Sequence, residues 1–359
     1  MAPFSLWYQL AADDPLMHQC NITVDKRTDG PGMSVIDSDD PAAPLYHLLA
    51  AMRTPVALRD LMIQPVRTGY VGQDHSIDPT LLPPAAGELY PKIEVGEIFL
   101  PSPDGSIRCQ TYKRATTHGR QAMLLYIHGG GFTVGQSEDT AYITSRIASE
   151  NRLVVLSVNY RLAPEWPFPS GLNDCLEVLK WMRTHGEEIG GDPNRIAVAG
   201  DSAGGNFAAA LPLAARNRGV EPPEAALLLC PITDFFFEQY PSFQKLAPRG
   251  IVYDTAFMGY IRGAYAVSYE NWSHPEVSPI RGDLSAFPPT LVLSGTADPL
   301  VDDNCAFVAK LREAGNPNVE HLVCEDMPHG FYFFHGMFVD SEVAYAAISR
   351  FFKQYLLEA

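Results

Sequence analysis

The spacing of apolar residues changes near residue 90 and divides the chain into two parts. Before that point the chain is rich in Pro, Asp and Gly, and one amphipathic stretch at 45–61 predicts a helix. After it, short apolar runs alternate with helical patterns, and these runs predict strands. The predicted strands span 92–100, 107–113, 122–128, 153–160, 195–200, 225–230, 290–294 and 320–324.

The segments between most of these strands carry the periodicity of amphipathic helices. The predicted helices span 140–150, 171–184, 203–216, 304–313 and 341–355. Continuously apolar strands that alternate with helices form a parallel sheet covered on both faces. The pattern therefore predicts an α/β fold.

One interval, residues 231–288, breaks the alternation. It has no strand-like run and is rich in aromatic residues. Insertions at the carboxyl edge of a parallel sheet commonly form lids over binding sites, so a lid is one interpretation. A peripheral helical subdomain with its own small core is the other, and the two are compatible.

The strongest chemical motif lies at residues 196–206, where a predicted buried strand runs into a G-x-S-x-G turn and then a helical pattern. A nucleophile on a tight strand-to-helix turn needs small residues two positions before and after it, since the backbone there approaches neighbouring strands. Gly200 and Gly204 occupy those positions around Ser202. We therefore expect Ser202 to be a nucleophile; a glycine-rich turn without chemistry is the alternative.

A second motif, HGGGF at residues 128–132, follows the third predicted strand. Consecutive glycines let the main chain approach a ligand and direct N–H groups at a developing oxyanion, and such a loop is typical of lipases and esterases. We expect the N–H groups of Gly130, Gly131 and Ala203 to form this oxyanion hole. A phosphate-binding loop is disfavoured, because neither a GK[ST] position nor a G-x-G-x-x-G pattern frames the helix.

A nucleophile on such a turn is followed along the chain by an acid and then a histidine. Asp298 comes just after the predicted strand 290–294, where a carboxylate can reach a loop imidazole. Asp302 and Asp303 compete with it. Both fall in the next helical segment, so we expect them to cap that helix or support the loop.

His329 is the predicted base, since it sits in a loop between Pro and Gly after the last predicted strand. The other candidates are less well placed: His321 lies within a strand, His335 in a later aromatic run and His274 in the insertion. The polar residues Arg161, Glu165 and Asp174 are expected to form an ion-pair cluster that braces the glycine loop. Asp201 is expected to order the same loop as a hydrogen-bond acceptor.

These motifs occur together with YRLAPEWPFP at 160–169, GDSAGGN at 200–206, DPL at 298–300 and HGF at 329–331. In this combination, over about residues 92–359, the chain resembles the hormone-sensitive-lipase-like (bacterial family IV) esterases of the α/β-hydrolase fold. The resemblance implies an eight-stranded, mostly parallel sheet and a helical cap. It also implies a serine carboxylesterase for short- to medium-chain acyl esters that needs no metal or cofactor.

The resemblance further implies a division of the chain into cap and core. Residues 1–90 and 231–288 would form the cap, and residues 91–230 and 289–359 the catalytic core. The N-terminal segment carries no matching motif, so its assignment rests on position. The family is compatible with a homodimer through the last strand or helix, and the sequence does not decide this.

Charge and cysteine content narrow the partners and the compartment. With 42 acidic and 26 basic side chains the net charge is −16, which repels phosphate backbones and makes nucleic acid an unsuitable partner. The chain has no stretch that predicts a membrane span, and its first residues do not resemble a secretory signal. Six cysteines without a C-x-x-C pair predict buried free thiols and a cytoplasmic location.

Two other functions use the same residues. An amidase, deacetylase or lactonase shares the Ser-His-Asp triad, because the pocket decides which bond is cleaved. Plant gibberellin receptors resemble this family but lack the catalytic histidine, so a non-catalytic small-molecule receptor is the second alternative. Since serine, aspartate and histidine are all present here, turnover of a small-molecule ester is the leading interpretation.

Overall fold

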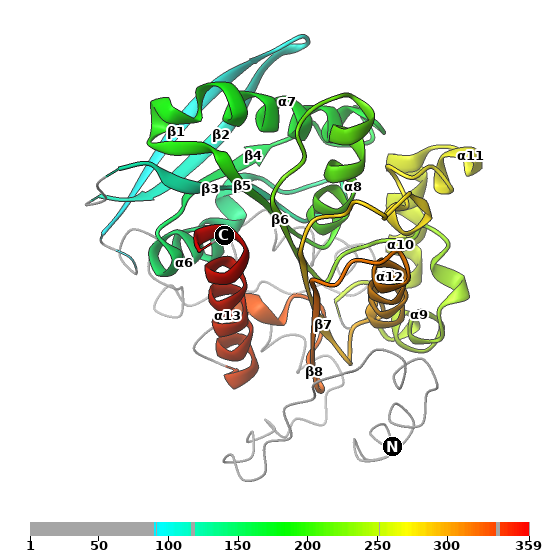
Figure 1. Ribbon diagram of the computed structural model, residues 1–359. Helices are drawn as coiled ribbons and strands as arrows, with labels where there is room; N and C mark the ends of the chain where they lie inside the picture. Colours follow the sequence, from blue (N-terminus) through cyan, green and yellow to red (C-terminus); the bar gives the residue numbers. More distant parts are fainter. Residues whose placement is uncertain (1–89, 91, 116–118, 251, 335–337, 359) are drawn as a thin grey trace, which may run out of the picture.

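The computed structural model describes residues 90, 92–115, 119–250, 252–334 and 338–358, and its centre is one eight-stranded sheet (Figure 1). The strand order is β1-β2-β4-β3-β5-β6-β7-β8. β2 pairs antiparallel with both β1 and β4, and all other pairs are parallel. The strands are β1 (Ile93–Ser102), β2 (Gly105–Arg114), β3 (Gln121–Ile127), β4 (Val154–Asn159), β5 (Gly191–Asp201), β6 (Ala225–Leu229), β7 (Thr290–Gly295) and β8 (Val319–Cys324).

All eight predicted strands are present, which confirms the α/β fold. The largest difference is at β5, which begins at Gly191 although its apolar run starts only at Ile196. Gly191 pairs with Gln121 across a register shift before the regular ladder resumes at Ile196. The polar start of β5 is thus recruited by its neighbour β3, a tertiary effect that apolar spacing does not report.

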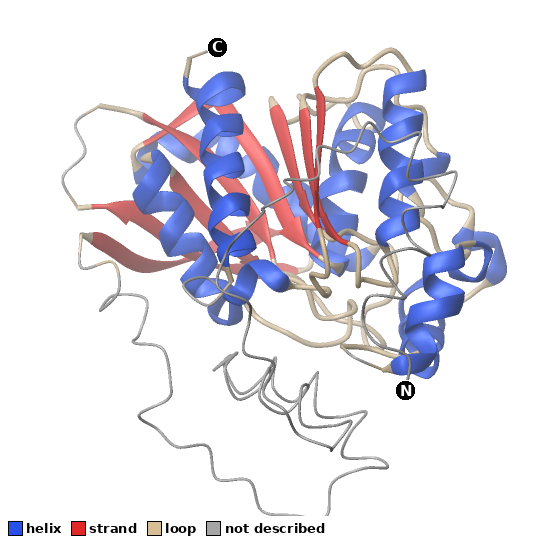
Figure 2. Cartoon of the chain, turned by 90° about the horizontal axis from the view of Figure 1, so that it is seen from below, coloured by secondary structure: helices blue, strands red, loops and turns tan. Residues whose placement is uncertain are grey.

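Helices cover both faces of the sheet, as Figure 2 shows. Alternate residues of β3 point to opposite sides: Met123 and Leu125 join one core cluster, and Leu124 and Tyr126 the other. The first cluster lies under α7 (Ser170–His185), α8 (Ala203–Asn217) and α12 (Val301–Glu313), and the second under α6 (Ala141–Asn151) and α13 (Val339–Phe352).

Short helical turns complete the part of the core that the structure describes. They are η2 (Ser137–Thr140), η3 (Gly186–Ile189), η8 (Phe331–Phe334) and η9 (Lys353–Leu357). No helix within the described ranges is long and apolar enough to cross a membrane. Five of the six cysteines, all but Cys20, are described, and each is a buried free thiol, as predicted. Cys20, like the predicted helix at 45–61, lies outside the described residues.

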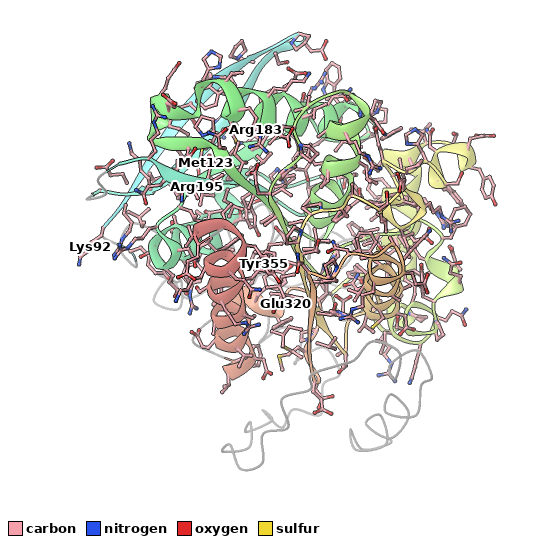
Figure 3. All side chains as sticks on the ribbon, in the orientation of Figure 1. Lys92, Met123, Arg183, Arg195, Glu320 and Tyr355 are labelled. Atoms are coloured by element: carbon pink, nitrogen blue, oxygen red, sulfur yellow. The ribbon has the colours of Figure 1, made fainter. Side chains whose placement is uncertain are left out.

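The amino ends of the parallel strands carry structural ion pairs. Arg183 donates to the Pro193 carbonyl oxygen at 2.7 Å and pairs with Glu224 at 2.9 Å, while Arg195 pairs with Asp192 at 2.8 Å. Figure 3 shows Arg183, Arg195 and Met123 grouped at this end of the sheet. The chemical motifs lie at the opposite edge of the sheet, where the parallel strands end.

The interval 231–288 forms a helical insertion between β6 and β7, beside α12 in Figure 1. Its elements are η4 (Phe237–Gln239), α9 (Pro241–Leu246), η5 (Ala247–Arg249), α10 (Thr255–Ile261), η6 (Arg262–Ala266), α11 (Tyr269–Trp272) and η7 (Pro279–Arg281). Whether it acts as a cap stays a prediction. The companion segment predicted for the cap, residues 1–90, lies outside the described residues except for Tyr90.

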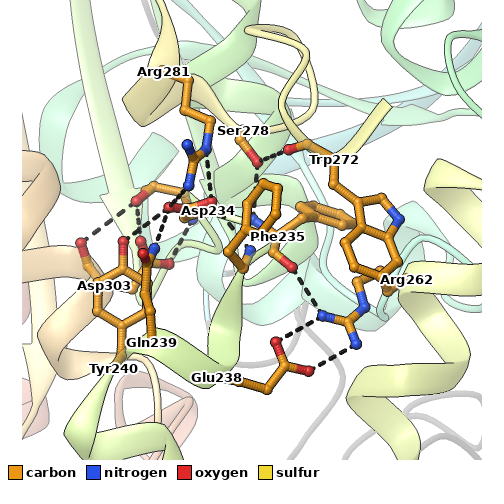
Figure 4. A network of polar contacts seen from close by, with 12 residues as sticks. Asp234, Phe235, Glu238, Gln239, Tyr240, Arg262, Trp272, Ser278, Arg281 and Asp303 are labelled. Carbon is orange, nitrogen blue, oxygen red and sulfur yellow. Dashed lines mark hydrogen bonds and ion pairs between the residues drawn. The ribbon is translucent and has the colours of Figure 1, made fainter. Parts of the chain in front are cut away.

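A polar network joins the start and the end of this insertion (Figure 4). The carboxylate of Asp234 accepts hydrogen bonds from Arg281 at 2.9 and 3.1 Å, from Gln239 at 2.6 Å and from Tyr240 at 3.1 Å. Buried Asp234 is thereby fully paired, which a charge with only 2% of its residue surface exposed requires. The insertion consequently has a polar frame of its own.

Candidate active site

Ser202 alone forms the turn between β5 and α8. Its backbone angles, φ 56° and ψ −115°, lie in a region that non-glycine residues rarely adopt. A Cβ on Gly200 would overlap the carbonyl of Gly204, and a Cβ on Gly204 would overlap the Ile127 carbonyl of β3. The predicted reason for these two glycines, close backbone approach, is therefore present, and the turn places Ser202 at the carboxyl edge of the sheet.

The glycine loop follows β3 on the neighbouring strand. Gly130 and Gly131 have φ values of 113° and 58°, which glycine adopts at little cost. Asp201 accepts hydrogen bonds from the Gly129 N–H and from the Tyr126 hydroxyl, the latter at 2.9 Å. Asp201 therefore orders the loop as an acceptor, as its position beside Ser202 suggested.

A second brace comes from the segment after β4. The Tyr160 hydroxyl donates to the His128 carbonyl oxygen at 3.0 Å, and the Ala163 N–H donates to the Phe132 carbonyl oxygen at 2.9 Å. The expected ion pair nearby is present, since Arg161 contacts Asp174 at 2.8 Å and also Asp104 at 2.9 Å. Glu165 is exposed and is not part of this ion pair, which corrects the predicted three-residue cluster. The brace on the glycine loop comes instead from the Tyr160 hydroxyl and the Ala163 N–H.

The third predicted oxyanion donor, Ala203, is the first residue of α8. The N–H groups in the first turn of a helix have no partner within the helix, and the helix dipole favours negative charge there. The backbone amides of Gly130, Gly131 and Ala203 thus belong to two adjacent strand ends. This arrangement suits stabilisation of a developing negative oxygen.

His329 and Asp298 lie together at the same edge. The Nδ1 of His329 is 2.8 Å from Oδ2 of Asp298, and the two side chains are 9% and 0% exposed. Since a carboxylate accepts, Nδ1 carries the proton, and Nε2 is left as the basic nitrogen. Gly295 lets the loop come this close, because a Cβ there would overlap the Met327 carbonyl.

Two further donors hold the other oxygen of Asp298. Its Oδ1 accepts hydrogen bonds from the Leu300 N–H at 2.9 Å and from the Tyr253 hydroxyl at 2.8 Å. The ring of Tyr253 also packs edge-on against the imidazole of His329, with ring centroids 5.0 Å apart and an interplanar angle of 89°. Tyr253 belongs to the insertion, whereas the other groups belong to the core.

Cys230, directly after β6, lies beside this pair. Burial raises its pKa well above the usual value, and the adjacent Asp298 charge raises it further, so it is a neutral thiol. The ligand atoms of Cys230, Asp298 and His329 all lie within 4.8 Å of one another, close enough to hold a metal ion. A metal would have to displace the Nδ1 proton and the thiol proton, so the group as it stands fits proton transfer better than metal binding.

The competing aspartates serve the insertion. In the first turn of α12, Asp302 accepts a hydrogen bond from the Ser242 N–H at 2.6 Å, and Asp303 accepts one from the Thr233 N–H at 2.7 Å. The prediction that they cap α12 is wrong, since the N-cap residue is Leu300 and no side chain caps the helix. Both aspartates instead accept hydrogen bonds from the insertion.

Among the competing histidines, His321 Nε2 lies 2.9 Å from Ser294 Oγ within the sheet. His274 belongs to the insertion, and its ring contacts that of Phe168, which lies between β4 and α7. Their positions place neither of them beside Asp298. His335 lies outside the described residues.

Two titratable groups of the glycine loop have shifted pKa values. Burial raises the pKa of Asp201 to about 6, although hydrogen bonds from Tyr126 and Gly129 oppose the shift. Burial lowers the pKa of His128 to about 4. His128 is therefore neutral near pH 7, and its Nδ1 donates to the Gly129 carbonyl oxygen at 2.7 Å.

Sequence analysis missed two residues of this cluster, Tyr253 and Cys230. Tyr253 is one aromatic residue among many in the insertion, and no spacing marks it. Cys230 stands at the end of an apolar run, where burial explains it sufficiently. The position of Cys230 could have drawn attention to it. It follows a central strand at the carboxyl edge of the sheet, where parallel α/β sheets bind ligands.

Comparison with known proteins places the chain among relatives of this architecture. A family model described as alpha/beta hydrolase fold matches residues 124–333. Over 250 residues the chain is 34% identical to carboxylesterase NlhH of Mycobacterium tuberculosis, covering 68% of this chain and 77% of that protein. It is 32% identical over 212 residues to ethyl acetate hydrolase of Pseudomonas putida, covering 58% of this chain and 66% of that protein.

Solved structures agree with this placement. An esterase from Pyrobaculum calidifontis superposes with a TM-score of 0.72 at 27% sequence identity. The match covers 87% of this chain and 97% of that structure. The likeness therefore extends over nearly the whole of the solved fold.

Proposed function

This chain belongs to the alpha/beta hydrolase family, in its hormone-sensitive-lipase-like branch, and from that premise we propose that it is a serine carboxylesterase for short- to medium-chain acyl esters. Ser202 would be the nucleophile, His329 the base and Asp298 the residue that orients the base. The observation that carries the proposal is the 2.8 Å hydrogen bond between His329 Nδ1 and Asp298, at the sheet edge that also presents Ser202.

The reaction begins when His329 Nε2 accepts the proton of Ser202 Oγ as that oxygen attacks the ester carbonyl carbon. The carbonyl oxygen becomes an oxyanion, which the N–H groups of Gly130, Gly131 and Ala203 stabilise. As the intermediate collapses, the carbon–oxygen bond to the alcohol breaks and His329 returns the proton to the leaving alcohol. An acyl-enzyme on Ser202 remains.

Deacylation repeats the cycle with water. His329 accepts a proton from water as the hydroxide oxygen attacks the acyl carbon, and then protonates Ser202 Oγ as the carboxylic acid departs. Asp298 stays ionised throughout: it holds the imidazole in the tautomer that leaves Nε2 basic and stabilises the imidazolium. No external oxidant or reductant takes part in these steps.

Side chains of the insertion would limit the size of the acyl group that the site accepts. Phe257 and Ile261 of α10 lie against Gly131, and their nearest carbons would be 2.9 and 2.8 Å from a Cβ at that glycine. These apolar side chains bound the space beside the oxyanion loop, which favours small apolar acyl groups over long ones. The similarity to ethyl acetate hydrolase of Pseudomonas putida, which is named for a short ester, supports the same preference.

Two alternatives use the same residues. An amidase, deacetylase or lactonase would share the triad, and a non-catalytic receptor would keep the pocket. The intact His329–Asp298 hydrogen bond favours turnover over a receptor, since a receptor has no use for an oriented base. The ester preference rests on the relatives.

The test is hydrolysis of p-nitrophenyl esters from acetate to palmitate by the wild-type protein and by Ser202→Ala. We expect turnover of the shorter esters, and a loss on the order of 10⁶-fold in kcat without Ser202. Ser285→Ala, which changes an exposed serine, is the matched control and should retain full activity. A folded wild-type protein without esterase activity would put the amidase and receptor functions first.

Two finer points are also proposals. The buried free thiols favour a reducing compartment such as the cytoplasm. A homodimer through β8 is favoured by its position, because β8 is the last strand of the described sheet and pairs only with β7 there. Light scattering of the purified protein decides the second point, and a monomer would exclude it.

A further inference from the structure

One side chain of the insertion, Tyr253, contacts both the proposed acid and the proposed base. We propose that Tyr253 is a positioning residue that completes the hydrogen bonding of Asp298 and fixes the ring of His329, so that the insertion is part of the catalytic frame. The inference rests on the function proposed above.

The first argument is the pairing of Asp298. This side chain is 0% exposed, so water is not available to solvate its charge. Oδ2 faces His329, and Oδ1 accepts from the Leu300 N–H and the Tyr253 hydroxyl. The Cys230 thiol also hydrogen-bonds Asp298. Removal of the Tyr253 hydroxyl would take one donor from this buried carboxylate, which costs free energy.

The second argument is the contact with His329. The rings of Tyr253 and His329 form a T-shaped pair, an arrangement that aromatic pairs prefer. The imidazole is thus restrained by its hydrogen bond to Asp298 at Nδ1 and by its contact with the Tyr253 ring. Tyr253 takes part in both restraints, since its hydroxyl binds Asp298 and its ring packs against His329.

The third argument is that the insertion is fastened beside Asp298. Ser242 Oγ donates to the Pro299 carbonyl oxygen at 2.8 Å, and the Ser242 N–H donates to Asp302. The segment that carries Tyr253 is therefore joined at Ser242 to the residues that follow Asp298.

The same short segment also reaches the oxyanion loop. Asp254, the residue after Tyr253, caps α10 by accepting from the Phe257 N–H at 2.7 Å. This helix N-cap fixes the start of α10, and Phe257 and Ile261 of that helix lie against Gly131. Residues 253–261 thus contact both halves of the proposed machinery.

The titratable groups that face the His329–Asp298 pair come from several elements. They are Cys230 at the end of β6, Asp201 at the end of β5, Tyr332 in η8 and Tyr253 itself. Burial raises the pKa of both tyrosines and of the thiol well above their usual values, so all three stay neutral. Asp201 is unchanged in both variants of the test, Tyr253→Phe and Tyr240→Phe.

The test is Tyr253→Phe, which removes one oxygen and keeps the ring. The hydroxyl disperses the charge of Asp298; without it the carboxylate holds the His329 proton more strongly. We expect kcat to fall by about five- to tenfold with KM within about twofold, and the acid limb of kcat/KM to move to higher pH by about half a unit. Rates are normalised to active sites titrated with a fluorophosphonate, so misfolded protein is not counted.

Tyr240→Phe is the matched control. Tyr240 is also a buried tyrosine of the insertion, 8% exposed, and its hydroxyl also donates to a buried aspartate, Asp234, at 3.1 Å. The control should lose a similar amount of thermal stability and keep the wild-type kcat and acid limb. The inference is wrong if Tyr253→Phe keeps the wild-type profile, or if Tyr240→Phe changes it equally.

A measurement without turnover separates this inference from the proposed function. The imidazole carbon-bound proton resonance of His329, assigned by its loss in His329→Ala, reports the ionisation of that ring by NMR. Its titration should shift to higher pH in Tyr253→Phe and stay unchanged in Tyr240→Phe. An inactive wild type would overturn the esterase proposal while this shift still supported Tyr253, and an unshifted titration would overturn Tyr253 in an active enzyme.

Discussion

The two halves of the proposed active site are built in different ways. The nucleophile half, Ser202 with the glycine loop, is held by main-chain packing between β3 and β5, where Gly200 and Gly204 leave no room for a side chain. The base half, Asp298 with His329, is held by side-chain donors such as Tyr253 that come from distant parts of the chain.

The difference predicts different failures. A Cβ that overlaps the main chain can be accommodated only if the strands move, so substitutions of Gly200 and Gly204 in the nucleophile half should cost folding. Side-chain hydrogen bonds can be removed one at a time while the strands stay in place, so changes in the base half should cost turnover and leave the fold. The predictions below probe this contrast.

Of the three variants that probe this contrast, Asp298→Asn in the base half is expected to have the largest effect on turnover. Asn keeps the shape but can donate to Nδ1, which favours the wrong imidazole tautomer. We expect kcat to fall by about 10⁴-fold, as in a serine protease with the same triad logic, with less than about 2 kcal/mol lost in stability. Kinetics and urea unfolding measured together check this, and an unfolded variant would contradict the contrast.

The second prediction concerns Gly204→Ala in the nucleophile half. The new Cβ would overlap the main-chain carbonyls of Ile127 and His128, so we expect a loss of about 3 kcal/mol or more in stability, or no folded protein. Gly259→Ala is the matched control, because it lies in α10 with nothing within 4 Å of its Cβ position. It should be neutral or stabilise by about 0.5–1 kcal/mol. Equal unfolding midpoints for the two variants would argue against close main-chain packing at Ser202.

The smallest effect is a pH dependence of stability that comes from Asp201. Its folded-state pKa of about 6 is above the ordinary value of 3.8, so its stabilising contribution is complete below pH 3.8 and is lost as the pH rises through about 6. The difference in unfolding free energy between wild type and Asp201→Asn should therefore change by on the order of 2 kcal/mol between pH 4 and 7, with the wild type relatively weaker at pH 7. Urea unfolding across this range checks it, and a difference that is constant with pH would exclude a titrating Asp201.

Much of the fold was predictable, because its signals are local. Every strand of the sheet was expected from an apolar run, and the core helices from their periodicity. The start of β5 at Gly191 was not, since it depends on pairing with Gln121. The carboxylate and imidazole candidates were separable by the predicted element in which each lies, a loop after a strand for Asp298 and His329. The structure places Asp298 against His329, while Asp302 binds the insertion.

The sequence by itself determined the order of strands and helices along the chain, the family, and the short motifs around Ser202, because each depends on neighbouring residues or on fixed spacing. The tertiary structure alone decided what surrounds Asp298: the Tyr253 hydroxyl, the Cys230 thiol and the anchoring of the insertion on α12. The physical reason is that a buried carboxylate collects donors from whichever segments the fold brings to it, and those segments carry no common spacing.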